Sequence, residues 1–455
     1  MIGISVLLQP QNEFMGRFDN HKKIIQLAIP IILANASAPL LGLADTATIG
    51  QTGSAADLGA IALATLVFSF VYWGFGFLRM GTTGFIAQAQ GAGDRKEVLA
   101  VLYRSVLLGL GIGLILILLQ SFIGRGAVAV MSASEEVKSL VSQYFYIRIW
   151  GAPATLTTYS LLGGLIGMGW TRELMWVQLF LNGLNIVLNV LFVIGFQYGI
   201  QGIALGTLLA EWIALFFAWY LIRRNLELKH PVKGMKELWV QIIDKTRMIA
   251  IFKVNGDIMI RTFALLGGFA WFADQGARFG DEILAANHVL LQFVSMSAFF
   301  LDGFAYVSEM YAGKTIGAGD RPGFVRQMRD STQLAGMTAL ILGLGIILFA
   351  PWAIQLLTRE QVVQSIAGQH AYFAGIYIMF SFVAFQLDGI FIGATRSKEM
   401  RNASILSLLI LVCAGTLLTA CCGNTGLWVS FIIYVVVRGV TLGVYMPRLL
   451  RDMFG

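Results

Sequence analysis

Charged residues are scarce in this chain of 455 residues, where Asp, Glu, Lys and Arg together make up 13% of the sequence. Soluble globular domains carry about 25% charged residues, and they are less apolar than this chain, which is 57% hydrophobic. The composition therefore excludes a soluble domain and indicates a protein that crosses a membrane many times. The net charge of +7 does not indicate nucleic-acid binding, because the basic residues lie between apolar segments and not on one face.

Cysteine and histidine are also rare. The three cysteines lie in or beside one late apolar segment, which offers neither a disulfide framework nor the spacing of a metal site. The four histidines are scattered along the chain, and no metal-ligand motif accompanies them. We therefore expect no metal and no cofactor, and we expect that the protein is not an enzyme. The N-terminus also lacks the basic region that begins a signal peptide.

Long apolar runs, in contrast, are frequent, and each reaches or exceeds the roughly twenty residues that a helix needs to span a bilayer. The expected spanning helices are 24–50, 58–88, 98–121, 139–168, 173–196, 199–222, 246–272, 283–311, 331–357, 366–394, 402–421 and 426–447. We expect an all-α polytopic membrane protein with twelve transmembrane helices in two pseudo-symmetric six-helix bundles. The predicted parts are an N-terminal segment 1–23, a first bundle 24–222, a basic linker 223–245, a second bundle 246–447 and a C-terminal segment 448–455.

The basic residues gather on one side of these expected helices. If the N-terminus lies inside, the outer side receives only Arg125, Lys138, Arg278 and Arg359. Cytoplasmic loops are the ones that carry an excess of Lys and Arg. We therefore expect a multi-pass protein of the bacterial cytoplasmic (inner) membrane, with both termini and the linker 223–245 in the cytoplasm.

Short motifs repeat between the two halves at an offset of about 224–226 residues. The matches are Gly91 to Arg95 with Gly317 to Arg321, Thr171-Arg172 with Thr395-Arg396, and Gly199 and Gly202 with Gly423 and Gly426. Each half holds an even number of helices, so an axis along the membrane normal relates the two. Two similar bundles indicate an alternating-access carrier, and a duplicated scaffold without a transport role is the alternative.

One carboxylate lies inside the first expected helix, 24–50. An acid at membrane depth costs about 2.5–3.5 kcal/mol on insertion scales, which makes Asp45 a candidate functional group. Pro30 in the same helix removes a backbone donor and invites a kink. Counting from the helix ends places Tyr144, Asn189 and Thr207 in the same layer as Asp45, roughly 7–12 Å below the outer surface.

The polar groups around Asp45 have two interpretations. Asn182, Asn185 and Asn189 are spaced to line one helix face, and as interhelical contacts each is worth about 0.6 kcal/mol. As a proton-coupling network, the amides would exchange hydrogen bonds when Asp45 gains or loses a proton. We favour the second interpretation, because packing alone does not require a charge. Glu211, one turn after Thr207, is either a second acid or a buried structural acid.

The second half carries a different polar set. Lys253, Asp257 and Arg261 are spaced four apart, so they form a ladder that can neutralise itself. Asp302 and Asp388 lie at a comparable depth in the cytoplasmic half of their helices. These charges form either a structural ion-pair network, which we favour, or a coupling network.

Seven stretches along the chain resemble one known family. They are APLLGLADTATIG (38–50), FLRMGTTGFIAQAQGAGD (77–94), LNIVLNVLFVIG (184–195), GIQGIALGT (199–207), NGDIMIR (255–261), LDGFAYVSE (301–309) and LDGIFIGATRSKEMRN (387–402). Together they resemble the MATE family of multidrug and toxic-compound extruders, specifically its DinF branch.

This resemblance implies a two-bundle antiporter that expels cationic amphipathic compounds against entering H⁺ or Na⁺. It implies that Asp45 carries the coupling with Tyr144, Asn185 and Thr207 as partners, and that the helix with Pro30 bends when the acid is protonated. The chain departs from the family at Asn189, where members often have an aspartate. A Na⁺ site usually needs several oxygens and at least one negative charge, so the missing second acid favours H⁺.

We therefore predict a secondary active multidrug antiporter that exports cationic amphipathic compounds in exchange for H⁺. A Na⁺-coupled antiporter and a lipid-linked oligosaccharide flippase remain alternatives. The flippase would need a basic cavity in the first half, where Arg79 and Arg148 stand against Asp45 and Glu211. We expect a monomer in the lipid bilayer whose partners are small cationic substrates and not nucleic acids.

Overall fold

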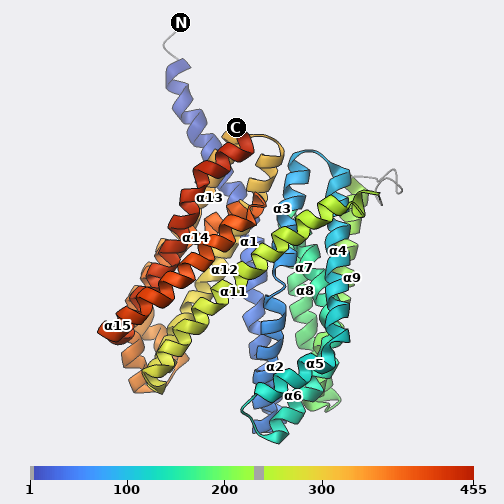
Figure 1. Ribbon diagram of the computed structural model, residues 1–455, viewed down its shortest axis with the longest axis vertical. Helices are drawn as coiled ribbons and strands as arrows, with labels where there is room; N and C mark the ends of the chain where they lie inside the picture. Colours follow the sequence, from blue (N-terminus) through green and yellow to red (C-terminus); the bar gives the residue numbers. More distant parts are fainter. Residues whose placement is uncertain (1–4, 230–239) are drawn as a thin grey trace. The chain divides into compact units, whose positions relative to one another are not determined.

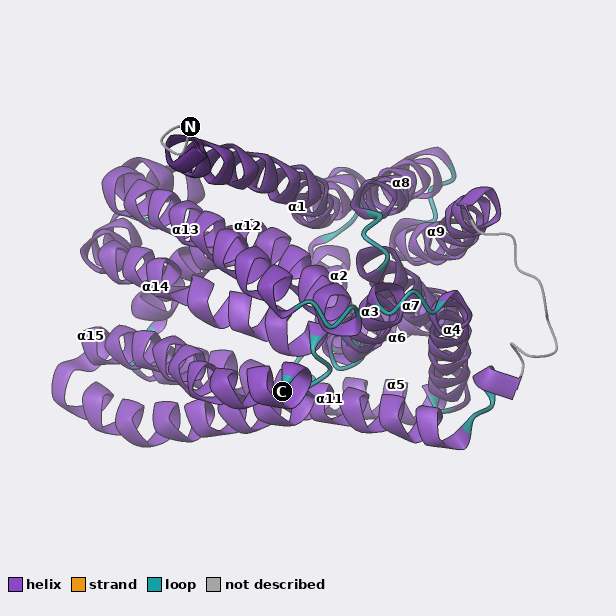
Figure 2. Ribbon diagram, turned by 90° about the horizontal axis from the view of Figure 1, so that it is seen from above, coloured by secondary structure: helices purple, strands orange, loops and turns teal. Residues whose placement is uncertain are grey.

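The computed structural model describes residues 5–229 and 240–455, and within these residues it contains helices and connecting loops but no β-strand. Figure 1 labels the helices, and Figure 2 shows the same all-helical fold from above. The helices of the first half are α1 (Ser5–Thr52), α2 (Ala55–Trp73), α3 (Phe77–Gly91), α4 (Arg95–Leu118), α5 (Gln120–Val130), α6 (Glu135–Arg148), η1 (Ile149–Gly151), α7 (Ala152–Gly167), α8 (Thr171–Val190), η2 (Leu191–Gly195) and α9 (Gly199–Lys229). Those of the second half are α11 (Lys245–Arg278), α12 (Asp281–Gly317), α13 (Arg321–Leu357), α14 (Gln361–Gly393) and α15 (Ser397–Phe454).

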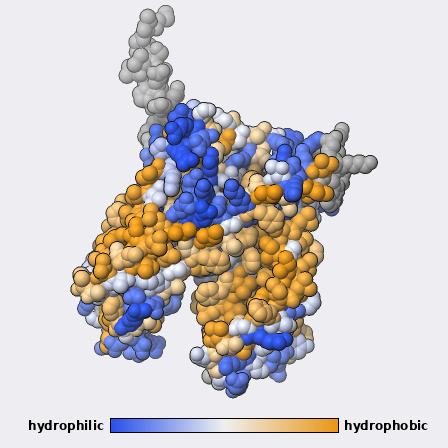
Figure 3. Space-filling view, viewed as in Figure 1, coloured by the Kyte–Doolittle hydropathy of each residue, from blue (hydrophilic) through white to orange (hydrophobic). Residues whose placement is uncertain are grey.

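Nine helices in the described part of the chain are long and apolar enough to cross a membrane. One of them, α15, consists of two helices, because its backbone leaves the helical region at Gly423 (φ 56°, ψ −135°). The helix α11 and the interrupted helix α6–η1–α7 supply two further spans. The predicted all-α fold with twelve transmembrane helices is thus confirmed. Figure 3 agrees with it, since apolar surface (orange) lies between hydrophilic ends (blue).

The chain divides into two compact units. Unit 1 comprises Met1–Ile32, Ala87–Gly93 and Gly256–Gly455, and unit 2 comprises Leu33–Ile86 and Asp94–Asn255. The helices α1, α3 and α11 therefore each contribute to both units. These units describe how residues pack, whereas the boundaries 24–222 and 246–447 describe the sequence repeat, so the domain boundaries stay a prediction.

Small residues allow close helix contacts inside each unit. In unit 2, a side chain at Gly163 of α7 would collide with the backbone oxygen of Arg79 in α3. In unit 1, a side chain at Gly389 of α14 would collide with the backbone oxygen of Ala305 in α12. Both pairs are related by the same sequence offset, so the repeat preserves a helix crossing that only small residues permit.

The repeated pentapeptide forms the same turn twice. Gly93 and Gly319 both adopt a left-handed backbone (φ 72° and 67°), which glycine tolerates without strain. The next residue then caps the following helix. Asp94 accepts a hydrogen bond from the backbone N–H of Glu97 at 3.0 Å, and Asp320 accepts one from Gly323 at 2.9 Å.

The structure corrects one of the predicted matches between the halves. The helix α8 starts at Thr171 and the helix α15 starts at Ser397, and each is preceded by a left-handed residue, Gly169 or Thr395. Thr395 therefore corresponds to Gly169, and the match of Thr171 with Thr395 was wrong by two residues. The left-handed pair Gly199 and Gly423 was matched correctly (φ 54° and 56°).

The first half is consequently two residues longer between these points, and α8 ends there in the π-helix η2. A π-turn is the usual way in which a helix absorbs an inserted residue, and such turns often occur at functional sites. Here the π-turn begins two residues after Asn189.

Candidate functional site

The three asparagines of α8 each face a different partner within unit 2. Asn189 donates a hydrogen bond of 2.6 Å to the carboxylate Oδ1 of Asp45. One turn earlier, the hydroxyl of Thr207 in α9 donates to Asn185 at 3.4 Å. Asn182 donates to the hydroxyl of Ser37 at 2.6 Å. All three asparagine side chains are buried. They therefore lie on one face of α8, as their spacing predicted.

Asp45 is half-buried, and Asn189 is its only hydrogen-bond partner in the described part of the chain. No basic side chain of that part lies within ion-pair distance of the Asp45 carboxylate, although Arg148 lies within electrostatic reach. The amide oxygen of Asn189 is buried and has no hydrogen-bond partner among the described residues. Asn189 therefore keeps a free acceptor beside the carboxylate to which its N–H donates.

Tyr144 contacts a different group from the one that the sequence suggested. Its hydroxyl accepts a hydrogen bond of 3.0 Å from Nη1 of Arg148, one turn later on α6. Nη2 of the same guanidinium lies 3.8 Å from Oε1 of Glu211 on α9. Tyr144 and Glu211, which the sequence analysis treated separately, therefore meet at Arg148.

We did not predict the importance of Arg148 from the sequence. We considered this residue only as part of the flippase alternative. Two signals were available. A cation at membrane depth is costly and by default has a role, and Arg148 is spaced to share a helix face with Tyr144.

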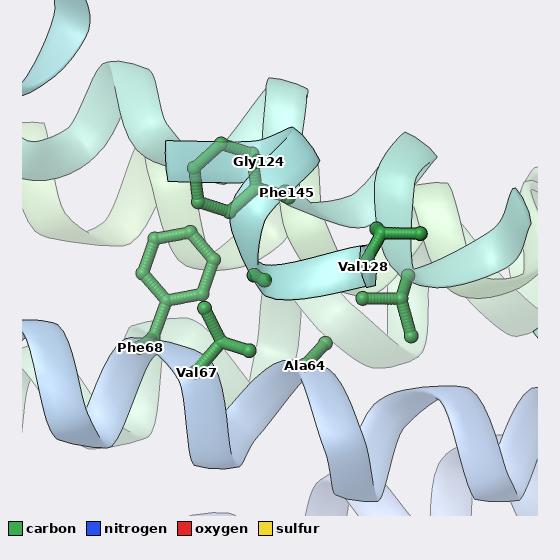
Figure 4. Close-up of a pocket in the computed structure, with 8 residues that line it drawn as sticks. Ala64, Val67, Phe68, Gly124, Val128 and Phe145 are labelled. Carbon is green, nitrogen blue, oxygen red and sulfur yellow. The ribbon is translucent and has the colours of Figure 1, made fainter. Parts of the chain in front are cut away.

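An aromatic platform fixes the guanidinium of Arg148. Its carbon atom lies 4.5 Å from the ring centre of Phe68 on α2, which is a cation–π distance. Figure 4 shows Phe68 beside Val67 and Ala64, facing Phe145 of α6 and Gly124 and Val128 of α5. The rings of Phe68 and Phe145 lie 5.5 Å apart. Phe68 is thus held by apolar packing while it supports the charge of Arg148.

Unit 2 also contains a partly open cavity of about 210 Å³ next to this cluster. Its polar wall contains one basic and one acidic residue, Arg148 and Glu211. The other residues that line it are Leu41, Tyr72, Thr155, Thr158, Tyr159, Leu162, Gln178, Leu181, Asn182, Asn185 and Thr207. The cavity therefore combines a few charged and hydroxyl groups with apolar side chains, as small-molecule sites do.

The charged residues of unit 1 are paired in a different way from the predicted ladder. Arg261 donates to Asp388 at 2.6 Å, and Arg438 lies 3.7 Å from the same carboxylate. Asp257 accepts a hydrogen bond from Arg401 at 2.6 Å. The partners come from α14 and α15, because these neighbouring helices offer better geometry than positions along one helix.

The remaining charges of the predicted set lie in less buried positions. Lys253 is exposed, and Asp302 is half-buried. The structure thus brings Arg261 together with Asp388, and Asp257 together with Arg401.

The predicted kink at Pro30 falls in a helix that continues through it. The helix α1 runs from Ser5 to Thr52, and the boundary between the two units falls between Ile32 and Leu33, two residues after Pro30. In the described part of the chain, no group of three or more His, Cys, Asp or Glu residues could hold a metal ion.

Comparisons with known proteins identify the family. The MatE family model matches residues 30–191 and 276–417. The DNA damage-inducible protein F of Escherichia coli (strain K12) is 34% identical over 95% of this chain and 93% of that protein. The multidrug resistance protein NorM of Vibrio cholerae is 26% identical over 92% of this chain and 93% of that protein.

The solved structures agree on the fold. A crystal structure of a MATE protein in the straight conformation covers 95% of this chain and 97% of its own, with a TM-score of 0.85 and 20% identity. These matches confirm the predicted family, its DinF branch and the expectation of a transporter that is not an enzyme. The chain therefore belongs to the MatE family of multi-pass membrane transporters.

Proposed function

We propose that this protein is a proton-coupled antiporter that exports cationic amphipathic compounds, with Asp45 as the group that carries the proton. The observation that carries the proposal is the contact between Asp45 and Asn189. Among the described residues, the one direct partner of this carboxylate is a neutral amide and no cation pairs with it, so a proton or a cationic substrate can neutralise it.

The amide of Asn189 supports both states of Asp45. When Asp45 is ionised, the amide N–H donates to it, as the structure has it. When Asp45 is protonated, its O–H can donate to the amide oxygen of Asn189, which has no other partner among the described residues. The protonated acid can keep the amide N–H on its carbonyl oxygen while its O–H donates to the amide oxygen, so proton loading adds a hydrogen bond to an acceptor that is otherwise unpartnered among the described residues.

Competition for Asp45 would couple the two fluxes. A cation bound near the ionised carboxylate leaves when a proton neutralises it, so one site cannot hold both. A 1:1 exchange of H⁺ for a monovalent cation moves no net charge, so a pH gradient would drive it, and each additional H⁺ that enters would contribute about 2.3 kcal/mol per 100 mV of membrane potential. The coupled change of access would use α1, whose residues are shared between the units near Pro30.

The lining of the cavity argues against the flippase alternative. Arg148 is its only basic lining residue, and Glu211 faces it, whereas an oligosaccharide pyrophosphate would need an excess of positive charge. We also propose that the protein lies in the bacterial cytoplasmic membrane as a monomer with both termini in the cytoplasm. The distribution of Lys and Arg supports this orientation.

Everted membrane vesicles test the function. Uptake of a fluorescent cationic dye is compared between the native protein and Asp45→Asn, under an imposed proton gradient or an imposed sodium gradient. Asp57→Asn is the matched control, because Asp57 is a half-buried capping residue in the first turn of α2. We expect a proton gradient to drive uptake by the native and control proteins and not by Asp45→Asn. Uptake driven by sodium alone, or normal uptake by Asp45→Asn, contradicts the proposal.

A further inference from the structure

One edge of the Arg148 guanidinium is unpartnered at the wall of the cavity in unit 2. Nη1 is bonded to Tyr144, and the face of the group lies on Phe68. Nε is buried and has no hydrogen-bond partner in the described part of the chain. Nη2 lies 3.8 Å from Glu211, which is too long for a hydrogen bond. Nε and Nη2 together form an edge that can bind a carboxylate through two parallel hydrogen bonds.

Other polar groups that line the same cavity also lack hydrogen-bond partners among the described residues. The hydroxyls of Tyr72, Thr155 and Thr158 and the Oε2 oxygen of Glu211 are buried without a hydrogen-bond partner among the described residues. Thr155 lies close to Tyr72 and Glu211, but without hydrogen-bond geometry. Buried polar groups normally find partners, so several such groups around one cavity indicate a polar ligand. The cavity offers hydrogen-bond donors beside Arg148 and an acceptor at Glu211.

The charges of the pair restrict what this ligand can be. A simple cation at Glu211 would leave Arg148 without a counter-charge at membrane depth, and a simple anion at Arg148 would leave Glu211 without one. Removing one partner of a buried ion pair is strongly unfavourable. A compound that carries both charges satisfies both residues, because it replaces one long ion pair by two shorter ones.

We propose that the cavity binds a small zwitterionic compound, with its carboxylate on the Nε–Nη2 edge of Arg148 and its ammonium group on Glu211. The volume of about 210 Å³ is smaller than a typical drug pocket, which suits a compound of the size of an aromatic amino acid. Leu41, Leu162 and Leu181 supply apolar surface for its ring. This inference rests on the proposed export function for its meaning as a substrate site, but its recognition chemistry does not involve Asp45.

The first test needs no mutation. Three radiolabelled probes share one indole ring and differ only in charge: tryptophan is a zwitterion, its methyl ester a cation and N-acetyltryptophan an anion. Their binding to the purified native protein is measured by equilibrium dialysis. We expect tryptophan to bind at least about tenfold more tightly than either derivative, because each derivative loses a charge-assisted hydrogen bond. Equal binding of tryptophan and its ester overturns the proposal.

The second test uses variants with opposite expected effects. Arg148→Gln should remove the preference for tryptophan over the methyl ester, on the order of tenfold or more, and Glu211→Gln should remove the preference over N-acetyltryptophan. Arg148→Lys should give an intermediate result, because it keeps the charge and loses the two-pronged edge. Lys138→Gln on α6 is the control, because Lys138 pairs with the exposed Glu135 away from the cavity.

A purely structural ion pair would give another pattern. Each variant would then weaken all three probes by the same factor, and that result overturns the proposal. These binding measurements use no gradient, so they are separable from the antiport. Asp45-dependent dye uptake without discrimination among the probes refutes only this inference, whereas discrimination without dye uptake refutes only the proposed export of cations.

Discussion

Gly206 of α9 leaves the space in which the Asn189 side chain binds Asp45. A methyl group at Gly206 would overlap the amide oxygen of Asn189, and it would lie only 3.0 Å from the backbone nitrogen of Asn189. The side chain must therefore turn away, because the backbone contact leaves the helices little room to adjust. Gly206→Ala should remove the hydrogen bond of 2.6 Å between Asn189 and Asp45.

The size of the effect follows from this single bond. A hydrogen bond to a charged group contributes about 1.5–3 kcal/mol and one to a neutral group about 0.5–1.5 kcal/mol, so loss of Asn189 from both states changes the balance between ionised and protonated Asp45 by roughly tenfold. The ionised form loses its direct partner, so the variant should hold its proton more tightly and release it less readily. We expect proton-driven dye uptake to fall by about tenfold, and the loss should be relieved as the pH is raised.

Two variants separate coupling from packing in this experiment. Gly183→Ala in α8 is the control, since nothing lies within 4 Å of a side chain there, and it should leave uptake and melting temperature near native. Gly206→Ala combined with Asn189→Ala relieves the overlap, so it should regain melting temperature without regaining proton-driven uptake. Native uptake by Gly206→Ala would refute the role of the Asn189–Asp45 bond, and so would full recovery by the double variant.

Three further outcomes follow from the packing and the ion pairs. Gly113→Ala should destabilise the protein by about 1–3 kcal/mol, because its methyl group would collide with the backbone of Pro153. Gly111→Ala on the same helix is the control, because no atom lies within 4 Å of its methyl group, and thermal unfolding compares the two variants. Asp388→Asn should lower the melting temperature and reduce the free energy of unfolding by about 3–5 kcal/mol, because Arg261 and Arg438 both pair with this carboxylate. Unchanged stability would assign the residue a purely functional role. Arg104→Gln should speed trypsin cleavage at Lys245, because the Arg104 guanidinium donates a hydrogen bond of 2.8 Å to the backbone carbonyl of Gln241. An unchanged cleavage rate would show that this contact does not anchor the chain between Gln241 and Lys245.

The helix count and the fold could be predicted because the membrane imposes simple rules. Each span needs a long apolar run, and the repeated Gly-Ala-Gly-Asp-Arg turns require the same left-handed glycine and the same capping aspartate in both halves. The short helix α5, Gln120–Val130, was not predicted, because it is too short to give a spanning signal. The two-residue shift between α8 and α15 escaped because Thr171 and Thr395 are each followed by arginine, and residue identity alone does not reveal that they take different places in the turn.

For the candidate site, the contact of the asparagine face with Asp45 was predictable from the sequence, and the pairing of the other groups was not. Asp45 and the asparagine face could be found because helical spacing and distance from the helix end place side chains reliably. The partner of Tyr144, in contrast, depends on side-chain direction and on the platform of Phe68, which no spacing rule contains. For the same reason Asp257 was expected beside Arg261 and instead pairs with Arg401 on another helix.

Proton release on substrate binding tests the central claim most directly. A cationic substrate is added to the purified protein in weakly buffered detergent solution at neutral pH, and a pH-sensitive dye reports the protons set free. If the substrate and the proton compete for Asp45, the native protein and Asp57→Asn release protons when the substrate binds. Asp45→Asn releases no protons, whether or not it binds the substrate. Proton release that persists in Asp45→Asn, or substrate binding by the native protein with no release between pH 5 and pH 9, would contradict the account.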